Sequence, residues 1–354
     1  MNESWVRSTV RDIPLYYNPK VKAVRMDTSV NVLGPNTVVK DVLARCMDLD
    51  LNQYPTPYSD ELRAALAEKY GLEADNFVVG NGSDEALDVA FKSFMEPGET
   101  VVAPYPSYVL HSFFVKVNGG RFITADLGQG FQLDPDALLD ARGKMIILCT
   151  PNNPTANCFH HRDVERVVRE HDGPVIVDEA YGEFARESFM SRVDEFENLI
   201  VTRTFSKAYG LAGFRVGYMA SNLKMAGVMQ RVKIPYSLDR VSELTAIAAL
   251  KNTSYVDAAV GLVREERSRL ASGLAGLGFK TFPSESNFIM FRSPRPSSDL
   301  VRRLAEKGVL IRDFGHLRML EDCVRTTIGT RELNDMLLLK LKEVTEDWEG
   351  SGDR

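Results

Sequence analysis

The alternation of short apolar runs with helical stretches between residues 100 and 202 constrains the fold more than any other feature of this sequence. The apolar runs have the length and composition of buried strands. These runs are residues 100–103, 122–124, 145–149, 175–177 and 199–201, and the helical stretches include 107–115 and 163–170. The pattern predicts an α/β fold with a mostly parallel sheet, helices on both faces, and chemistry at the carboxyl ends of the strands.

The run at 199–201 leads into a polar loop that contains Ser206 and Lys207 and is followed by glycines at 210, 213 and 217. A loop lysine is ordinarily a solvated surface residue, so its neighbours decide how it is interpreted. This one follows a strand, beside a hydroxyl group and eight residues before Arg215. The amine is a candidate nucleophile, and Ser206 and Arg215 are candidates for holding an anion.

A second candidate anion site follows the predicted strand at 77–79, where the chain reads Gly80-Asn-Gly-Ser-Asp-Glu85 and enters a helix. A glycine turn that opens a helix exposes unpaired N–H groups at the positive end of the helix dipole, which suits a phosphate. The same string also matches the start of a Gly-x-Gly-x-x-Gly dinucleotide fingerprint. Its third glycine position is Glu85, which disfavours a nicotinamide dehydrogenase relative to an enzyme with a single-phosphate cofactor.

Four further polar or aromatic side chains lie where predicted strands end. Tyr108, in Pro-Tyr-Pro-Ser-Tyr, is placed to cover a planar cofactor, although a core-edge aromatic is an equally good interpretation. Asn153 lies in Thr-Pro-Asn-Asn-Pro-Thr, whose prolines fix the direction of its amide. Asp178 follows the run at 175–177, and Tyr181 comes three residues later. Each side chain is therefore expected at the edge of the sheet where chemistry takes place.

Composition excludes several classes of function. The 354 residues are 44% hydrophobic and 26% charged, as in ordinary globular proteins, and a net charge of −6 without a basic run argues against nucleic-acid binding. No stretch approaches the ~18 apolar residues of a membrane span, and the N-terminus has no apolar signal region, so we expect a cytoplasmic protein away from membranes. The cysteines and histidines lack metal-ligand spacing, so we expect reduced thiols and no metal site.

The window Ser206-Lys-Ala-Tyr-Gly-Leu-Ala-Gly-Phe-Arg-Val-Gly217 resembles the lysine signature of aminotransferases of the aspartate aminotransferase fold, within them the histidinol-phosphate aminotransferase branch. In that family the lysine carries pyridoxal 5′-phosphate (PLP) as a Schiff base. The resemblance covers nearly the whole chain. It implies the PLP-dependent transferase fold type I, which has a large domain with a mostly parallel seven-stranded sheet flanked by helices and a smaller α/β domain.

The resemblance also implies roles for individual residues. Lys207 would act on the substrate, Asp178 would keep the pyridine nitrogen of PLP protonated, and Tyr108 would stack on the ring. Asn153 and Tyr181 would contact the ring hydroxyl. Donors to the cofactor phosphate would come from Gly82, Ser83, Asp84, Ser206 and Arg215. Tyr54 matches a tyrosine that reaches the phosphate in the neighbouring subunit, which implies a homodimer.

On the substrate side the resemblance is less complete. Arg325 and Arg312 match the arginines that bind the substrate anion, and their planar guanidinium groups suit a phosphate or a carboxylate. Tyr16 and Asn31 are expected near the substrate. The family usually has a Thr-Asn-Glu-Asn-Pro-like string before Gly-Pro, whereas this chain has Ser29 and Val30 in place of the amide and the carboxylate. Selectivity is therefore expected to differ at this point.

The remainder of the chain predicts the domain organisation. Strands are expected at 287–291, 309–312 and 324–327, interleaved with helices at 255–277, 298–307 and 330–346. We expect an N-terminal arm at 1–40 that joins the small domain, a large PLP-binding domain at 41–240 and a small C-terminal domain at 241–354. Within the large domain, Ser59 is expected to cap a helix that ends at Gly71.

The function expected from the resemblance is amino transfer from histidinol phosphate to 2-oxoglutarate, so the partners are a small amino donor and a 2-oxo acid. Aromatic or other amino acids are alternative donors. A PLP-dependent decarboxylase of the threonine-phosphate type would keep the same cofactor residues. A dehydrogenase and a non-catalytic regulator stay open as rivals from other classes, although Lys207, Asp178 and Asn153 together give no sign of a regulator.

Overall fold

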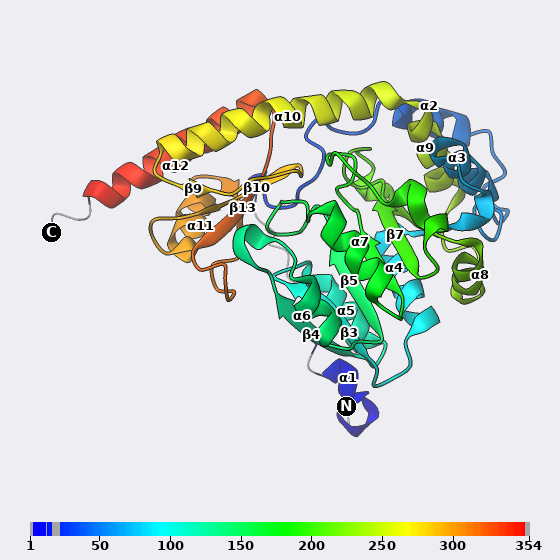
Figure 1. Ribbon diagram of the computed structural model, residues 1–354. Coiled ribbons are helices and arrows are strands. Elements are labelled where there is room, and N and C mark those ends of the chain that lie inside the picture. The colour runs from blue at the N-terminus through cyan, green and yellow to red at the C-terminus, as the bar shows by residue number, and fades with distance from the viewer. Residues whose placement is uncertain (1–2, 12, 16–21, 351–354) are drawn as a thin grey trace.

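The computed structural model describes residues 3–11, 13–15 and 22–350, and its strands form two main sheets (Figure 1). The larger sheet has seven strands in the order β2-β8-β7-β6-β5-β3-β4. Its strands are β2 (Phe77–Asn81), β3 (Thr100–Tyr105), β4 (Arg121–Asp126), β5 (Met145–Cys149), β6 (Val175–Asp178), β7 (Leu199–Thr204) and β8 (Val216–Ser221). The expected α/β fold with a mostly parallel seven-stranded sheet is thus confirmed.

One strand of the larger sheet, β8, runs antiparallel to both of its neighbours, β2 and β7. The other neighbouring pairs are parallel. The sequence analysis did not identify β8, because it treated the glycines around it as a loop. A short chain reversal between β7 and β8 contains Lys207, so the antiparallel pair fixes both ends of the lysine loop.

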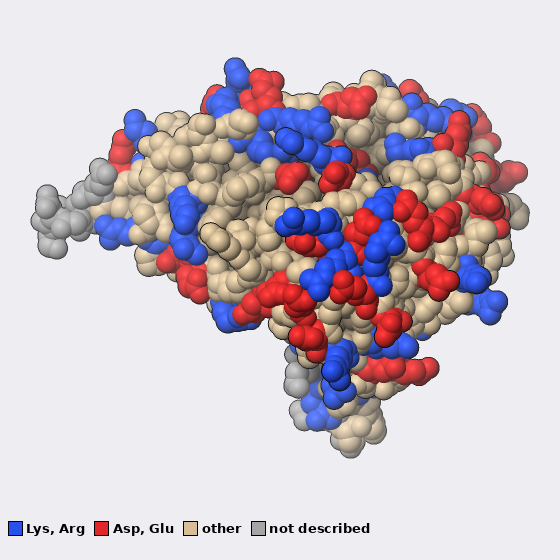
Figure 2. Space-filling view, in the orientation of Figure 1, with Lys and Arg blue, Asp and Glu red and all other residues tan. Residues whose placement is uncertain are grey.

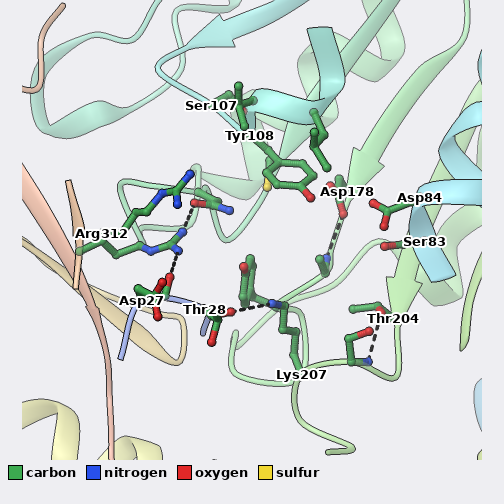
Figure 3. A pocket seen from close by; sticks show the side chains of 18 of the residues that line it. Asp27, Thr28, Ser83, Asp84, Ser107, Tyr108, Asp178, Thr204, Lys207 and Arg312 are labelled. Carbon is green, nitrogen blue, oxygen red and sulfur yellow. Dashed lines mark hydrogen bonds between the residues drawn. The ribbon is translucent and has the colours of Figure 1, made fainter. Parts of the chain in front are cut away.

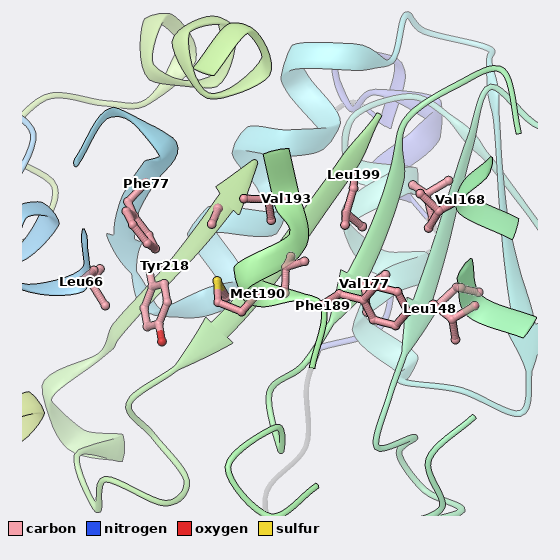
Figure 4. Packing of buried hydrophobic residues seen from close by; sticks show 14 of the residues in the cluster. Leu66, Phe77, Leu148, Val168, Val177, Phe189, Met190, Val193, Leu199 and Tyr218 are labelled. Carbon is pink, nitrogen blue, oxygen red and sulfur yellow. The ribbon is translucent and has the colours of Figure 1, made fainter. Parts of the chain in front are cut away.

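Helices cover both faces of the larger sheet, as predicted. Alternate strand residues face opposite ways, so Val177 packs with Leu148 and Tyr218 on one face, whereas Ile176 packs with Ile147 on the other. The first face is covered by α3 (Asp60–Tyr70), α7 (His161–Glu170) and α9 (Arg240–Lys251), and the second by α4 (Gly82–Phe94), α5 (Val109–Val117) and α8 (Leu223–Val232). Figure 4 shows part of the first cluster. Each large side chain buried there contributes about 1.5–3 kcal/mol.

The second sheet is antiparallel, with four strands in the order β12-β13-β10-β9. Its strands are β9 (Lys280–Thr281), β10 (Phe288–Arg292), β12 (Arg312–Asp313) and β13 (Cys323–Thr327). The helices beside it are α10 (Thr253–Gly276), α11 (Ser297–Glu306) and α12 (Arg331–Gly350). In Figure 1, α10 runs along the top of the molecule from the larger sheet to the second sheet.

The prediction of a single strand at 309–312 was wrong. This stretch forms two short strands that belong to different sheets. Residues Val309–Leu310 form β11, which pairs in parallel with β1 (Val24–Arg25). Arg312 then pairs with Arg325 of β13. The pairing of β1 with β11 brings the segment around residue 25 beside the second sheet, over a sequence separation that no local pattern reveals.

Capping of α3 also differs from the prediction. Ser59 occupies the N-cap position but has φ of 57° and makes no capping hydrogen bond with its side chain. The hydroxyl of Thr56 accepts the hydrogen bond from the Asp60 N–H instead, at 3.1 Å. The predicted end of the helix is correct: Gly71 adopts a left-handed conformation with φ of 68°, and its N–H donates to the carbonyl of Ala67.

Shorter helices complete the fold. They are α1 (Ser8–Arg11), α2 (Val38–Cys46), α6 (Pro135–Asp140) and the 3₁₀ segments Glu3–Trp5, Ala74–Asn76, Gln129–Phe131, Met190–Glu195 and Ala212–Phe214. Within the described ranges, no helix combines the length and apolar character that a bilayer crossing requires.

Candidate active site

The carboxyl ends of β5, β6 and β7 open into a cavity of about 250 Å³ that also takes residues from the second sheet (Figure 3). Eleven of the residues singled out in the sequence line it. They are Ser83, Asp84, Tyr108, Asn153, Asp178, Tyr181, Ser206, Lys207, Arg215, Arg312 and Arg325. Parallel strands bring their carboxyl ends to one edge, which explains why side chains so far apart in sequence meet here.

The amine of Lys207 projects into this cavity from the loop after β7. Its Nζ donates a hydrogen bond to the carbonyl of Thr28 at 3.5 Å and lies 5.3 Å from the centre of the Tyr181 ring. The pKa of Lys207 is lowered from 10.5 to about 8, first by burial and then by the positive charge of Arg325. The lysine is therefore far easier to deprotonate than a solvated one, as a nucleophile and proton carrier requires.

Asp178, at the end of β6, is held by three partners. Its Oδ1 accepts hydrogen bonds from the Thr202 hydroxyl and the Ala180 N–H, both at 3.1 Å. Its Oδ2 lies 3.1 Å from Nε2 of His111. Because Nδ1 of His111 is buried without a hydrogen-bond partner among the described residues, Nε2 carries the hydrogen and donates it to Asp178. These three contacts fix the orientation of the carboxylate.

His111 is a site residue that the sequence analysis missed, because its neighbours in sequence gave it no partner. It is fully buried, and its ring meets the Tyr108 ring edge to face with 5.3 Å between centres. Tyr108 is the N-cap of α5, so a residue three positions later lies on the same side of the helix. The three-residue spacing between Tyr108 and His111 could therefore have indicated from the sequence that His111 lies near the site.

An anion cradle lies where α4 begins, and its geometry fits the phosphate of PLP. Gly82 has φ of 80°, and a Cβ there would lie 2.6 Å from Nη2 of Arg215. A Cβ at Gly217 would collide with the backbone N of Ser83. The hydroxyl of Ser206 is buried without a partner among the described residues. Two absent side chains, an orphaned hydroxyl and a helix N-terminus thus leave room and donors for a phosphate.

Within the cradle, Arg215 pairs with the carboxylate of Asp84 at 2.7 Å. Arg215 itself has φ of 53°, a left-handed conformation that is unusual for a residue with a side chain. The pair holds the guanidinium beside Gly82, facing the start of α4. Asp84 therefore contributes in two ways: its carboxylate orients Arg215, and its backbone lies in the first turn of the helix.

The opposite side of the cavity is cationic. Arg312 and Arg325 are directly paired residues on antiparallel strands, so their side chains leave the sheet on the same face. Arg325 is 7% exposed, and its guanidinium lies 4.8 Å from the centre of the Phe288 ring. It donates to the Asn153 side-chain oxygen and, at 2.9 Å, to the carbonyl of Asp27.

The cavity also has lining residues that the sequence analysis did not find, several of them in and just after β1. Arg25 makes a bidentate pair with Asp27, with distances of 2.7 and 2.8 Å, and both line the cavity beside Thr28. They are brought there by the pairing of β1 with β11, which has no local sequence signal. Ser107, Thr204, Phe314 and Leu317 also line the cavity.

Three of the predicted site residues that the structure describes do not line the cavity. Gly82 lies behind it, against Arg215. Asn31 braces the lysine loop, because its amide donates to the carbonyl of Ala208 at 2.8 Å. Tyr54 is 83% exposed, and its ring packs against that of Tyr236 at a tilt of 37°, with 4.9 Å between ring centres. Tyr16 lies outside the described residues.

No group of three or more His, Cys, Asp or Glu side chains suited to a metal ion occurs in the part of the chain that the structure describes. At the place where a dinucleotide fingerprint would need its third glycine, the Glu85 carboxylate accepts hydrogen bonds from the Asn81 N–H and, at 2.8 Å, from the Ser237 hydroxyl. That side chain fills the space beside the glycine turn.

A sheet whose strand ends present a buried lysine amine, a clamped carboxylate and an anion cradle defines the class of PLP-dependent transferases. Comparison with known proteins agrees. The sequence model of the aminotransferase class I and II family matches residues 26–341. The chain therefore belongs to the class I and II aminotransferases.

Individual relatives are similar over most of their length. Histidinol-phosphate aminotransferase 2 of Cupriavidus pinatubonensis is 37% identical over 350 residues, which cover 95% of each chain. The histidinol-phosphate aminotransferase of Caldanaerobacter subterraneus subsp. tengcongensis is 35% identical over 315 residues, covering 88% of this chain and 89% of that protein. The crystal structure of the Sinorhizobium meliloti histidinol-phosphate aminotransferase in complex with pyridoxal-5′-phosphate superimposes with a TM-score of 0.90, at 26% identity and 98% coverage of both chains.

Proposed function

We propose that this aminotransferase uses PLP to pass the amino group of histidinol phosphate to 2-oxoglutarate. The observation that carries the proposal is that the Lys207 amine, the Asp178 carboxylate and the Arg312–Arg325 pair line one cavity. The relatives described above are named histidinol-phosphate aminotransferases and are similar to this chain over nearly their whole length, which supports the choice of donor.

The residues that would hold PLP follow from the cradle and the carboxylate. Ser206, Arg215 and the first turn of α4 would bind its phosphate, and Asp178 would pair with its pyridine nitrogen. Asn153 and Tyr181 are candidate partners for the hydroxyl group of the PLP ring, and Tyr108 is the candidate residue to stack on the face of the ring. When bound, PLP supplies an electron sink that makes a proton on the donor's α-carbon removable.

Lys207 would be both the attachment point and the proton carrier. Its free amine would take up the proton from the α-carbon of the donor and release it again later in the reaction, which is general acid–base catalysis. A pKa of about 8 suits that role, because the amine exchanges protons readily near neutral pH. Asp178 keeps its orientation through His111 and Thr202 while the proton moves.

The two arginines would bind the anionic group of the donor or of the oxo acid. Arg325 is positioned by Asn153 and by the carbonyl of Asp27, so its planar guanidinium has one orientation. Arg312, on the adjacent strand, is less buried and shares its face. A pair of guanidinium groups suits the two negative charges of a phosphate ester, and each can bind a carboxylate when the oxo acid enters.

We propose a homodimer in which Tyr54 approaches the cofactor phosphate of the second subunit. Support comes from an exposed apolar surface around Tyr54, which a single chain leaves in contact with solvent. Its large side chains are Leu49, Leu51, Tyr54, Ile234 and Tyr236. Mixing inactive Lys207→Ala chains with inactive Tyr54→Ala chains tests this, because hybrid dimers would regain one intact site. Sedimentation as a monomer, or no recovery of activity, would refute it.

We also propose an N-terminal arm, a large domain and a small domain, with the second boundary at Asn252, between α9 and α10, in place of residue 240. Support comes from the packing of α9: Ala246, Ala249 and Leu250 belong to the hydrophobic cluster of the larger sheet. Limited proteolysis should cleave the chain first near the boundaries between the arm and the two domains. Earlier cleavage within α9 would contradict the boundary at Asn252. The cytoplasmic location stays a prediction.

The donor is tested with the purified holoenzyme by following the visible absorbance of bound cofactor while histidinol phosphate, glutamate, phenylalanine and threonine phosphate are added separately. Histidinol phosphate should change the spectrum, and 2-oxoglutarate should restore it. A response to another donor alone would refute this substrate while leaving amino transfer intact. Release of carbon dioxide from threonine phosphate would favour the decarboxylase. Lys207→Ala is the control that should transfer no amino group from any of these donors to 2-oxoglutarate.

A further inference from the structure

A second hollow, of about 520 Å³, lies between α10 and the segment that follows β6. It shares no lining residue with the catalytic cavity. Three arginines dominate its wall: Arg264 and Arg267 come from α10, and Arg186 comes from the segment after β6. Glu285 is its acidic residue. Figure 2 shows Lys and Arg side chains gathered over the middle of α10 and just below it.

These arginines lack the carboxylate partners that arginines elsewhere on the molecule have. Within the described ranges, none of Arg186, Arg264 and Arg267 forms a salt bridge. By contrast, Arg269 on the same helix pairs with Glu266 at 2.7 Å. Three guanidinium groups and one carboxylate leave the hollow with an excess of two positive charges.

Arg267 is the most enclosed of the three. One of its terminal nitrogens donates to the carbonyl of Ser286 at 2.8 Å, which orients the guanidinium, and its Nε is buried without a partner among the described residues. Burial lowers the pKa of Arg267; Glu285 opposes that change, and Arg264 and Arg186 add to it. Guanidinium groups that repel one another in a partly dry hollow are stabilised by an anion between them.

We propose that this arginine hollow, lined by Arg186, Arg264 and Arg267, binds a small metabolite that carries a phosphate or pyrophosphate group. Two excess positive charges match a phosphate ester, and the planar donors of arginine match its oxygens. Ser268 lines the same hollow and supplies a hydroxyl donor. The volume exceeds what a single inorganic phosphate fills, so a larger phosphate-bearing molecule suits it. This site goes beyond the proposed function and does not depend on it.

The hollow adjoins elements that build the catalytic cavity, which gives binding a structural consequence. Arg186 lies five residues after Tyr181, and Phe184 between them packs in the same cluster as Tyr181. On the other wall, the N–H of Glu285 donates to the carbonyl of Ala156 at 2.7 Å, three residues after Asn153. An anion that joins Arg186 to α10 would therefore brace the wall that carries Asn153 and Tyr181.

Calorimetric titration of inorganic pyrophosphate into the PLP-loaded enzyme at fixed ionic strength tests the proposal. Binding should weaken strongly in the double variant Arg264→Gln/Arg267→Gln, since each lost charge-assisted contact costs about tenfold or more in affinity. The matched control is Arg162→Gln/Lys224→Gln, which loses the same charge from exposed positions on α7 and α8 and should bind like the parent. Arg186→Gln, at an exposed position, weakens binding without risk to folding.

Pyrophosphate can also enter the catalytic cavity, so Arg325→Gln separates the two sites. Binding that survives in Arg325→Gln and is lost in Arg264→Gln/Arg267→Gln would support the arginine hollow. Equal binding by the parent and Arg264→Gln/Arg267→Gln, or loss of all binding in Arg325→Gln, would overturn it. Failure of the donor test above would leave this result unaffected, because the titration measures binding alone.

Discussion

Replacing Gly82 by alanine tests the anion cradle with a perturbation whose size the structure sets. The residue has φ of 80°, where an L side chain costs about 1–2 kcal/mol of folding free energy. The new Cβ would also lie 2.6 Å from Nη2 and 3.2 Å from Cζ of Arg215. Since the backbone of α4 is fixed by its helix, the guanidinium has to move away from the start of α4.

Displacing Arg215 would remove the charge-assisted contact that we propose it makes to the cofactor phosphate. Such contacts are worth about 1.5–3 kcal/mol, so PLP affinity should fall about tenfold to a hundredfold. The affinity is measured by titrating PLP into the cofactor-free protein and following visible absorbance, with thermal unfolding of the same protein as the stability readout. If Gly82→Ala lost stability but kept its PLP affinity, the substitution would have strained the backbone without disturbing an anion cradle.

Gly71→Ala is the matched control for this experiment. Gly71 also has a left-handed backbone, with φ of 68°, but a Cβ there would meet nothing within 4 Å. Both variants should lose similar folding free energy, and only Gly82→Ala should lose PLP affinity. The reasoning is refuted if Gly82→Ala binds PLP as tightly as the parent, or if Gly71→Ala weakens binding to the same extent.

Three other perturbations address the rest of the site. Asp178→Asn should lower the rate of amino transfer by about a hundredfold or more. PLP should still bind Lys207 in this variant, which borohydride reduction followed by mass spectrometry would show. An unchanged rate would contradict the role of the carboxylate. The pKa of Lys207 falls from 10.5 to about 8 on folding, so the unfolded chain binds more protons between these values and the stability of the cofactor-free protein gains from rising pH in that window. Lys207→Met should lack this gain when the free energy of unfolding in urea is measured below and above the window. The same pH dependence in Lys207→Met and the parent would refute the prediction. Arg325→Lys should raise the KM for the donor about tenfold, with the more exposed Arg312→Lys costing less; the reverse order would assign the anion to Arg312.

The part of the site that was predictable comes from the parallel strands. Asn153, Asp178 and Lys207 each follow a short apolar run, and the pairing of β5, β6 and β7 in parallel brings those three ends to one edge. Local patterns suffice for this, because the runs are contiguous and a βα rhythm specifies strand direction. The glycine turn before α4 was readable for the same reason: its residues are neighbours in the chain.

The parts that were missed depend on contacts over long sequence separations. Arg25, Asp27 and Thr28 enter the cavity because β1 pairs with β11, almost three hundred residues away in sequence, and neither strand has more than two residues. His111 contributes through a side chain that meets Asp178 only in the folded state. Ser59 was predicted to cap α3, but it has a left-handed backbone and its side chain makes no capping hydrogen bond, and the nearby Thr56 hydroxyl binds the N–H of Asp60.

The contacts between the two sheets explain why the site needs both. Arg325 of the second sheet donates to Asn153 in the loop after β5, and the carbonyl of Thr28, in the segment after β1, accepts from the amine of Lys207 in the loop after β7. The charge of Arg325 also lowers the pKa of Lys207. An anion bound to Arg325 screens that charge and so shifts the amine toward its protonated form. If the donor's anion binds Arg325 as proposed above, donor binding changes the protonation of Lys207, and this coupling follows from the position of one guanidinium.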